Sequence, residues 1–216
     1  MKYELVVFDW DGTLLDSTGA IVRAIQAACA DLELPVPSRA QASHVIGLGL
    51  GDAMRHAVPD LAAENYQDMI ERYRFHYLSA DHELRLFEGV PQMLARLQNA
   101  GHILAVATGK SRVGLERALD HSGLRTFFSA SRCADECHSK PHPQMLEELL
   151  AEFGMAETAA VMIGDTSHDL LMAKNAGVDA LAVSYGAHPA VQLHAHAPRA
   201  CVQDVAELDA WLRVNG

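Results

Sequence analysis

Short runs of apolar residues recur along the chain and predict buried strands. Polar residues do not alternate with the apolar ones within these runs, which is typical of strands that are covered on both faces. The predicted strands are Leu5–Phe8, His102–Thr108, Ala160–Ile163, Ala180–Val183 and, more weakly, Ala200–Val202.

Helical patterns lie between these runs. The first has Pro91 at a suitable first helical position and Gly101 just past its end. Strands that alternate with helices indicate a parallel sheet with helices on both faces, so we expect an α/β, Rossmann-like core of three layers. The predicted helices cover Pro91–Ala100, Arg112–Ser122, Pro143–Phe153 and Leu170–Asn175.

One long stretch, residues 16–84, interrupts the alternation, because it contains helical patterns and loops but no convincing strand. Asp16-Ser17-Thr18 has the composition of an N-cap for a helix that continues to Ala30. Residues 61–80 form a second amphipathic helix or helix pair. We therefore expect a core domain of residues 1–15 and 85–216, with an all-helical domain of residues 16–84 inserted after the first strand.

Four clusters of polar residues and glycines fall at or near the predicted strand ends. Ligands of open parallel sheets bind beyond the carboxyl ends of the strands, so these clusters are expected to converge. One of them follows an irregular segment rather than a clear strand. The clusters are Asp9–Thr13, Thr108–Lys110, Lys140-Pro141 and Gly164–Asp169.

The side chains in these clusters suit phosphoryl transfer. A carboxylate can attack phosphorus as a covalent nucleophile, and a second acid two residues away can protonate the leaving oxygen, as Asp9 and Asp11 would. Carboxylates repel a phosphate dianion, so a cation must neutralise the site, and Mg²⁺ prefers such oxygen ligands. Lys140 would hold the nucleophile and the phosphoryl charge, and Thr108 would donate a hydrogen bond.

The order and spacing of these motifs resemble the haloacid dehalogenase superfamily, in particular its phosphoglycolate-phosphatase-like branch with a helical cap. The matching features are Asp-x-Asp-Gly-Thr at residue 9, a Thr closing the second strand, Lys140 in Ser-Lys-Pro, and Gly-Asp-Thr-x-x-Asp at residue 164. The resemblance extends over nearly the whole chain. It implies an enzyme that hydrolyses a small phosphomonoester metabolite through an aspartyl-phosphate intermediate.

The resemblance also implies a role for each motif residue. Asp9 would be the nucleophile and Asp11 the general acid and base. Mg²⁺ would be held by the side chains of Asp9 and Asp165 and by the backbone carbonyl of Asp11, while Asp169 would orient a metal-bound water or the lysine. The phosphoryl group would be bound by Thr108, Gly109 and Lys140, and the helical insertion would be a cap that closes over the substrate.

Related chemistries of this superfamily fit the sequence less well. A dehalogenase has no acid at the position of Asp11, and a phosphonatase needs a cap lysine, whereas residues 16–84 contain no lysine. P-type ATPases have Thr in place of Asp11 and also carry membrane helices. A phosphomutase of the β-phosphoglucomutase type shares every motif and remains an alternative, as does a phosphate-binding regulatory module without turnover.

Composition narrows the class of partner. The net charge is −11, from 17 basic and 28 acidic residues, so nucleic acids and anionic membranes are not expected to bind. No stretch approaches the length of a transmembrane helix, and the start Met1–Glu4 does not resemble a signal peptide. The four cysteines lack the spacing of a disulfide framework, which indicates reduced thiols and a cytoplasmic protein. The sequence is compatible with a monomer or a homodimer.

Several smaller features stay open. Gly47–Gly51 is either a turn between two cap helices or a loop that faces the substrate. Cys133, Cys137 and His138 resemble a metal site without a clean second pair of ligands. A transition metal at His188, His194 and His196 is less expected than a solvated polar segment. The sequence does not decide whether His138, His142 and His168 contact substrate.

The natural substrate cannot be read from the motifs, because the residues that handle the phosphoryl group say nothing about the leaving group. The insertion offers five arginines as anion binders, although such side chains are more often solvated than functional. They are Arg23, Arg39, Arg55, Arg72 and Arg74.

Overall fold

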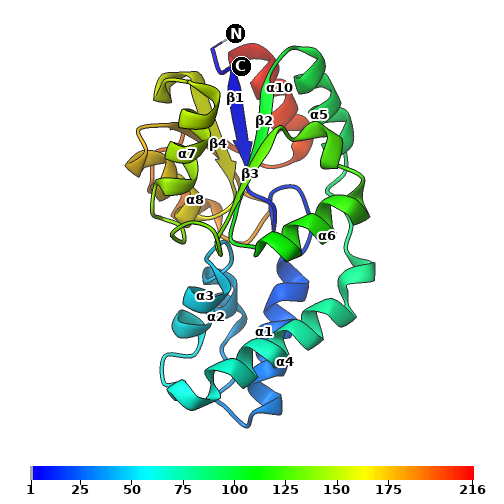
Figure 1. Cartoon of the computed structure of the whole chain (residues 1–216), viewed down its shortest axis with the longest axis vertical. Coiled ribbons are helices and arrows are strands. Elements are labelled where there is room, and N and C mark those ends of the chain that lie inside the picture. Colours follow the sequence, from blue (N-terminus) through cyan, green and yellow to red (C-terminus); the bar gives the residue numbers. More distant parts are fainter. Residues whose placement is uncertain (1) are drawn as a thin grey trace.

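Six parallel strands form the centre of the computed structural model, which describes residues 2–216 (Figure 1). The strand order is β3-β2-β1-β4-β5-β6, and all neighbours pair in parallel. The chain leaves β1 on one side and later returns to β4 on its other side, which places a topological switch point beside β1. The strands are β1 (Leu5–Phe8), β2 (Ile103–Thr108), β3 (Ala130–Cys133), β4 (Ala160–Gly164), β5 (Asp179–Val183) and β6 (Cys201–Val202).

Helices cover both faces of the sheet, so the predicted three-layer α/β core is confirmed. Side chains of β1 alternate between two hydrophobic clusters, with Val6 and Phe8 on one face and Leu5 and Val7 on the other. The first cluster is covered by α5 (Val90–Asn99), α6 (Arg112–Ser122) and α10 (Val205–Asn215), and the second by α7 (Gln144–Phe153) and α8 (Ser167–Asn175). The short α9 (Ala190–His194) packs near the β5–β6 edge.

Three elements of the core, β3, α9 and α10, were not expected from the hydrophobic pattern. β3 is an edge strand whose Ser131 and Arg132 are half-buried and polar, and only Cys133 is fully buried. An edge strand with one buried position has no continuous apolar run, which explains the omission. Short 3₁₀ turns also connect the elements, at Ala63–Asn65, Asp81–Glu83, Arg125–Phe127 and Glu157–Ala159.

Between β1 and α5 the chain forms only helices, as the sequence predicts for this stretch. They are α1 (Thr18–Asp31), α2 (Arg39–His44), α3 (Leu50–Ala57) and α4 (Tyr66–Ser79), and α1 packs against α4 below the sheet in Figure 1. Two antiparallel chain segments join these helices to the sheet. Backbone hydrogen bonds hold the segments together, from Asp16 to Arg85 at 2.9 Å and from Phe87 to Leu14 at 3.0 Å.

No helix within residues 2–216 combines the length and the apolar character that crossing a membrane requires. The interpretation of the start of the chain rests partly on Met1, which lies outside the described residues.

Candidate active site

Three aspartates meet at the carboxyl ends of the central strands. Asp9 follows β1, Asp165 follows β4, and Asp169 lies in the first turn of α8. One carboxylate oxygen of each lies within 4.8 Å of the other two, and all three side chains are buried. The three motif aspartates that the sequence placed at strand ends are therefore brought to one point by the parallel sheet.

Lys140 reaches this cluster from the loop after β3. Its Nζ atom lies 2.8 Å from Asp9 Oδ1 and 2.6 Å from Asp169 Oδ1, and the residue is only 2% exposed. Burial lowers the pKa of Lys140, but the charges of Asp169 and Asp9 more than offset this and hold that pKa above its usual value. The lysine is therefore a fixed positive charge beside Asp9.

The Asp9 carboxylate lacks the hydrogen bonds that a buried acid normally makes. Its Oδ1 faces only the Lys140 ammonium, 2.8 Å away, and its Oδ2 has no hydrogen-bond partner among the described residues. Burial raises the pKa of Asp9 to about 7, with Lys140 acting in the opposite direction. Buried carboxylate oxygens without donors are suited to a cation or to a reacting group, so the residues present fit a divalent metal.

Asp165 is held rigidly by short contacts. Thr13 Oγ1 donates to Asp165 Oδ1 at 2.9 Å, and the backbone N–H of Ala187 donates to Oδ2 at 2.7 Å. Burial, together with the charges of Asp9 and Asp169, raises the pKa of Asp165 well above its usual value. Gly12, at a φ of 82°, leaves no room for a Cβ beside this carboxylate, so the Asp-Gly-Thr sequence of the first motif has a steric reason.

Asp169 serves two neighbours at once. Its Oδ1 accepts from Lys140, and its Oδ2 accepts from the backbone N–H of Thr166 at 3.1 Å and from the Thr166 hydroxyl at 2.7 Å. The Thr166 side chain in turn caps α8, so the two residues form a capping box. Asp169 thus fixes the lysine and the start of α8 together.

Asp11 lies apart from this acidic cluster and faces different partners. Ser17 Oγ donates to Asp11 Oδ1 at 2.6 Å, and Lys110 Nζ lies 3.0 Å from Oδ2. The N-cap expected at Asp16-Ser17-Thr18 is therefore confirmed in its position but not in its side-chain hydrogen bond. Ser17 occupies the cap position of α1, but its side chain makes no capping hydrogen bond and binds Asp11 instead.

Lys110 belongs to the second strand-end cluster of the sequence, but no role was predicted for it. It contacts Asp11, and its ammonium also donates to the hydroxyl of Tyr77 on α4 at 3.0 Å. Burial lowers the pKa of Lys110, but Asp11 and Tyr77 raise it above its usual value. The available signal was its position directly after Thr108-Gly109, at the end of a predicted strand.

Gly109, directly after Thr108 at the end of β2, forms the contact between the sheet and the loop Gly47–Gly51. Thr108 is buried, and its Oγ1 accepts from the backbone N–H of Lys110 at 3.2 Å. A Cβ on Gly109 would lie 2.6 Å from the Gly47 carbonyl oxygen and closer still to that of Leu48. The loop is both a turn between α2 and α3 and a border of the site, so the two alternatives that the sequence left open for Gly47–Gly51 both apply.

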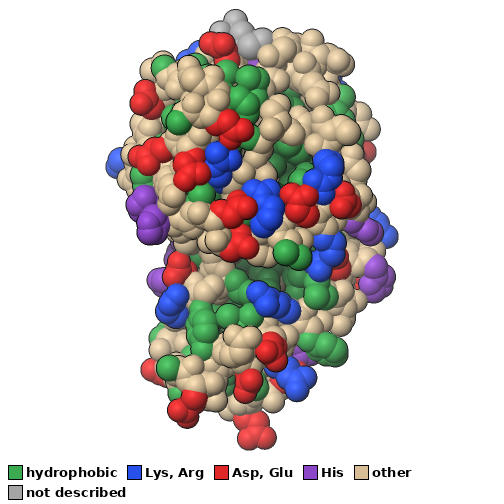
Figure 2. Space-filling view, viewed as in Figure 1, with side chains coloured by type: hydrophobic (Ala, Val, Ile, Leu, Met, Phe, Trp, Pro, Cys, Tyr) green, Lys and Arg blue, Asp and Glu red, His purple; other side chains and the backbone are tan. Residues whose placement is uncertain are grey.

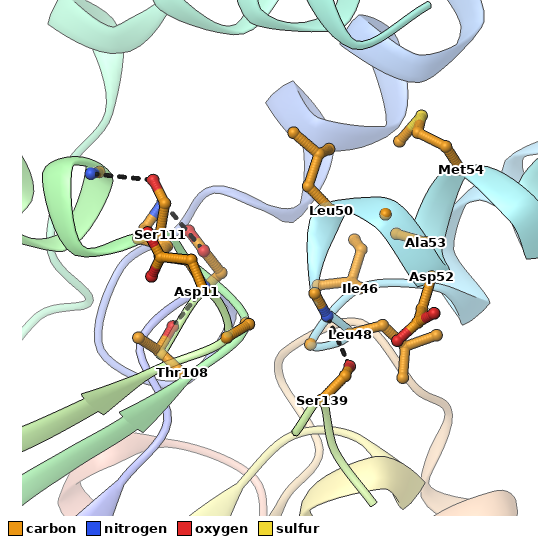
Figure 3. Close-up of a pocket in the computed structure, with 18 of the residues that line it drawn as sticks. Asp11, Ile46, Leu48, Leu50, Asp52, Ala53, Met54, Thr108, Ser111 and Ser139 are labelled. Carbon is orange, nitrogen blue, oxygen red and sulfur yellow. Dashed lines mark hydrogen bonds and ion pairs between the residues drawn. The ribbon is translucent and has the colours of Figure 1, made fainter. Parts of the chain in front are cut away.

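A cavity of about 830 Å³ lies between the helical insertion and the sheet, and both Asp9 and Asp11 line it. Figure 3 shows Asp11, Thr108 and Ser111 on one side, and Ile46, Leu50 and Met54 on the other. The Ser139 hydroxyl accepts from the backbone N–H of Gly49 at 2.8 Å and ties the loop to the segment that carries Lys140. Of the five insertion arginines considered above, Arg55 and Arg74 line this cavity.

Of the three C-terminal histidines, only His188 departs from the solvated polar segment that the sequence suggested. His188 is 2% exposed and stacks on His44 with ring centroids 5.0 Å apart, whereas His194 is exposed. His188 and His168 both hydrogen-bond the carbonyl oxygen of His44, at 3.1 and 2.8 Å. They connect α2 to the core beside the acidic cluster.

The cysteine motif contributes no cluster of metal ligands. Cys133 is buried in the core, and the Cys137 thiol lies 3.7 Å from Glu148 Oε2. Among residues 2–216, only the three aspartates described above bring metal-ligating atoms of this kind together. The four cysteines are free thiols.

Comparisons with known proteins agree with this geometry. The family model described as haloacid dehalogenase-like hydrolase matches residues 6–183. The probable phosphatase IndB of Dickeya dadantii is 37% identical over 94% of this chain and 91% of its own length. A 5'-nucleotidase of Pseudomonas aeruginosa is 32% identical (96% and 95% covered), and a phosphoglycolate phosphatase of Aliivibrio fischeri is 33% identical (85% of each). A crystal structure of a predicted phosphoglycolate phosphatase from Haemophilus somnus superimposes with a TM-score of 0.88 at 26% identity, covering 100% of this chain and 99% of the other.

Proposed function

Because the chain belongs to the haloacid dehalogenase-like hydrolases, we propose that it is a Mg²⁺-dependent phosphatase that cleaves a small phosphorylated metabolite. The family resemblance of the sequence motifs is confirmed by the family match, and the relatives named as phosphatases support hydrolysis of phosphoric monoesters. The observation that carries the proposal is the Asp9 carboxylate. It is buried at the end of β1, its Oδ1 lies 2.8 Å from the ammonium of Lys140, and its Oδ2 has no hydrogen-bond donor.

In the proposed reaction, Asp9 attacks phosphorus and forms an aspartyl phosphate while the bond to the leaving oxygen breaks. Asp11 gives its proton to that oxygen and then accepts one from the water that hydrolyses the intermediate. The products are an alcohol and inorganic phosphate. Lys140 stabilises the phosphoryl charge, and Thr108 and Gly109 bind its oxygens at the end of β2.

We further propose that Asp9, Asp165 and the backbone carbonyl of Asp11 hold the Mg²⁺. When bound, the ion supplies positive charge that offsets the repulsion between the aspartates and the substrate phosphate. The donor-free Oδ2 of Asp9 supports this assignment, since Mg²⁺ takes oxygen ligands. Asp169 supports the site by holding Lys140, because its Oδ1 accepts from that ammonium at 2.6 Å.

Residues 16–84 are proposed to act as a cap on a core made of residues 1–15 and 85–216. Two features support this division: the helices join the sheet through only two paired segments, and their loop Gly47–Gly51 lies against Gly109. A cap that closes on the core excludes water and brings leaving-group contacts to the site.

The test is phosphate release by the purified protein from a panel of phosphomonoesters that includes p-nitrophenyl phosphate. We expect turnover with Mg²⁺, loss of turnover in excess chelator, and recovery when Mg²⁺ is restored. Full activity in excess chelator would contradict the metal assignment. Isomerisation of a sugar phosphate without release of phosphate would contradict hydrolysis.

A further inference from the structure

The cavity next to Asp9 and Asp11 is large for the leaving group of a two-carbon acid. Its volume of about 830 Å³ falls in the upper part of the roughly 300–1,000 Å³ range of pockets that hold drug-sized ligands. The loop Gly47–Gly51 already touches Gly109, so this volume remains with the insertion in contact with the core. A glycolate would leave most of it to water.

The side of the cavity formed by the insertion is predominantly apolar. Apolar residues line it from α1, α3, α4 and the segment between α2 and α3, and Figure 3 shows several of them opposite Asp11. Apolar walls bind apolar ligand surface by removing both from water. The aliphatic lining comprises Ile21, Ile25, Ile46, Leu50, Met54 and Ile70.

Two tyrosines of α4 add an aromatic wall. The rings of Tyr73 and Tyr77 stack with centroids 5.9 Å apart and an interplanar angle of 17°, and both residues line the cavity. The Tyr77 hydroxyl accepts from Lys110, which fixes that ring next to Asp11. Aromatic faces favour offset or edge contacts with another ring.

The mouth of the cavity is also apolar on both sides. Leu78 of α4 is 45% exposed, and Val113 of α6 is 78% exposed, yet both line the cavity. Figure 2 shows hydrophobic side chains gathered in the hollow between the core and the helical insertion, with basic side chains around it. An apolar leaving group would cover such side chains.

Positive charges in the cavity are mostly neutralised by neighbouring acids. Lys110 lies 3.0 Å from Asp11, Arg55 lies 3.5 Å from Asp52, and Arg117 lies 3.1 Å from Asp81. Arg74 makes no ion pair among the described residues, but its side chain is on an exposed position of α4. A carboxylate on the leaving group would therefore find no buried cation of its own.

We infer that the substrates are monophosphates whose leaving group carries a planar ring, seated against Tyr73 and the aliphatic wall of the cavity. This inference rests on the proposed phosphatase function and defines its substrate class. Aryl phosphates and nucleoside 5′-monophosphates share this chemistry, whereas phosphoglycolate does not. The reaction is unchanged: the P–O bond breaks, water supplies the hydroxyl, and the ring leaves as its free alcohol or phenol.

The test measures kcat/KM for phosphoglycolate, ethyl phosphate, 2-naphthyl phosphate and a set of nucleoside 5′-monophosphates in the presence of Mg²⁺. We expect Tyr73→Ala to lower kcat/KM for the ring-bearing substrates about tenfold and to change that for ethyl phosphate less than twofold. Tyr73→Phe keeps the ring and should restore wild-type values. Phe75→Ala, a matched loss of a ring on the exposed side of α4, should leave all values unchanged.

The outcomes separate the two proposals. A preference for 2-naphthyl phosphate or for nucleoside 5′-monophosphates supports a ring-bearing leaving group and shows which of the two kinds of ring the cavity binds. Two results would overturn the inference and leave the proposed phosphatase function intact. One is a higher kcat/KM for phosphoglycolate than for every ring-bearing ester. The other is that Tyr73→Ala lowers kcat/KM equally for all esters while Tyr73→Phe keeps wild-type values. A lack of activity on every phosphomonoester would instead overturn the proposed function. Thermal melting of each variant checks that it is folded.

Discussion

At the scale of single residues, the two acids of the first motif have different surroundings although one residue separates them. Asp9 lies in the buried cluster, with Oδ1 beside the Lys140 ammonium and Oδ2 without a hydrogen-bond donor. Asp11 accepts from Ser17 and pairs with Lys110 at the edge of the cavity. Trp10 between them points into the hydrophobic core, which holds the two acids in place from the opposite side of the chain.

This difference leads to a prediction about p-nitrophenyl phosphate. In Asp11→Asn the first step should survive, because the phenolate leaves without a proton, but hydrolysis of the intermediate lacks its base. We expect a burst of p-nitrophenol followed by turnover slowed by about 10²–10⁴-fold, with phosphate trapped on Asp9 and visible by mass spectrometry. Asp9→Asn is the control and should show neither burst nor adduct. An adduct in Asp9→Asn, with steady turnover in Asp11→Asn, would mean that the roles are reversed.

A second residue-level prediction concerns His188 and pH. Its Nδ1 accepts from the backbone N–H of Ser167 at 3.0 Å, and burial, followed by the charge of His168, lowers the pKa of His188 to about 4. An unfolded histidine titrates near 6.5, so between these values the unfolded state binds a proton that the folded state does not. The stability contribution of the neutral ring is present above pH 6.5 and lost as pH falls toward 4.

We therefore expect the free energy of unfolding of the wild type to decrease by about 2 kcal/mol as the pH is lowered from 6.5 to 4. The urea midpoint should decrease with it. His188→Gln removes the titrating group, so its midpoint should fall less over the same range. If the urea midpoints of the two proteins decrease equally with pH, His188 does not cause the loss of stability.

At the scale of elements, the close approach between the β2–α6 connection and the loop Gly47–Gly51 positions the insertion. Gly109 lies directly beneath the backbone carbonyls of Gly47 and Leu48, and Ser139 binds Gly49. Backbone atoms cannot rotate away as side chains do, so this contact requires a residue without a Cβ.

Gly109→Ala should accordingly displace the loop. We expect kcat/KM to fall at least tenfold and hydrogen exchange of residues 47–51 to increase, since overpacking typically costs about 1–3 kcal/mol. Gly19→Ala, within α1, is the matched control, because the nearest atom to its Cβ would be the flexible end of Arg23 at 3.3 Å. Unchanged exchange and activity in Gly109→Ala would show that the contact is not maintained in solution.

At the scale of the whole molecule, the site concentrates charge within a protein that is already acidic. Three buried aspartates face one buried lysine, Lys140, and the net charge of the chain is −11. Buried negative charges that are not fully neutralised by positive charges destabilise the folded state, so a bound divalent cation should stabilise it.

We predict that Mg²⁺ raises the melting temperature of the chelator-treated protein. At a hundredfold excess over Kd, a ligand that binds only the folded state adds about 2.7 kcal/mol, which corresponds to a rise of about 5–10 °C for a chain of this size. Asp165→Asn should reduce this rise, whereas Asp135→Asn, an exposed change in the same cavity, should not. No shift with Mg²⁺ in the wild type would contradict a metal site at the three aspartates.

The sequence by itself determined the central sheet and the acidic motifs. β1, β2, β4 and β5 are covered on both faces, so their apolar runs are continuous and identify them without knowledge of their neighbours. The parallel sheet then brings strand ends together, so Asp9 and Asp165 were expected to meet. Their meeting depends on topology alone and needs no detail of packing.

Only the tertiary structure decided the remaining features, because they depend on contacts that leave no periodic signal. The edge strand β3 has a single buried side chain, so its pattern resembles that of a loop. Lys110 reaches Asp11 and Tyr77 across two separate parts of the chain, and Ser17 binds Asp11 instead of capping its helix. The cavity forms where four helices and the ends of three strands converge, and no local pattern encodes the space that they leave.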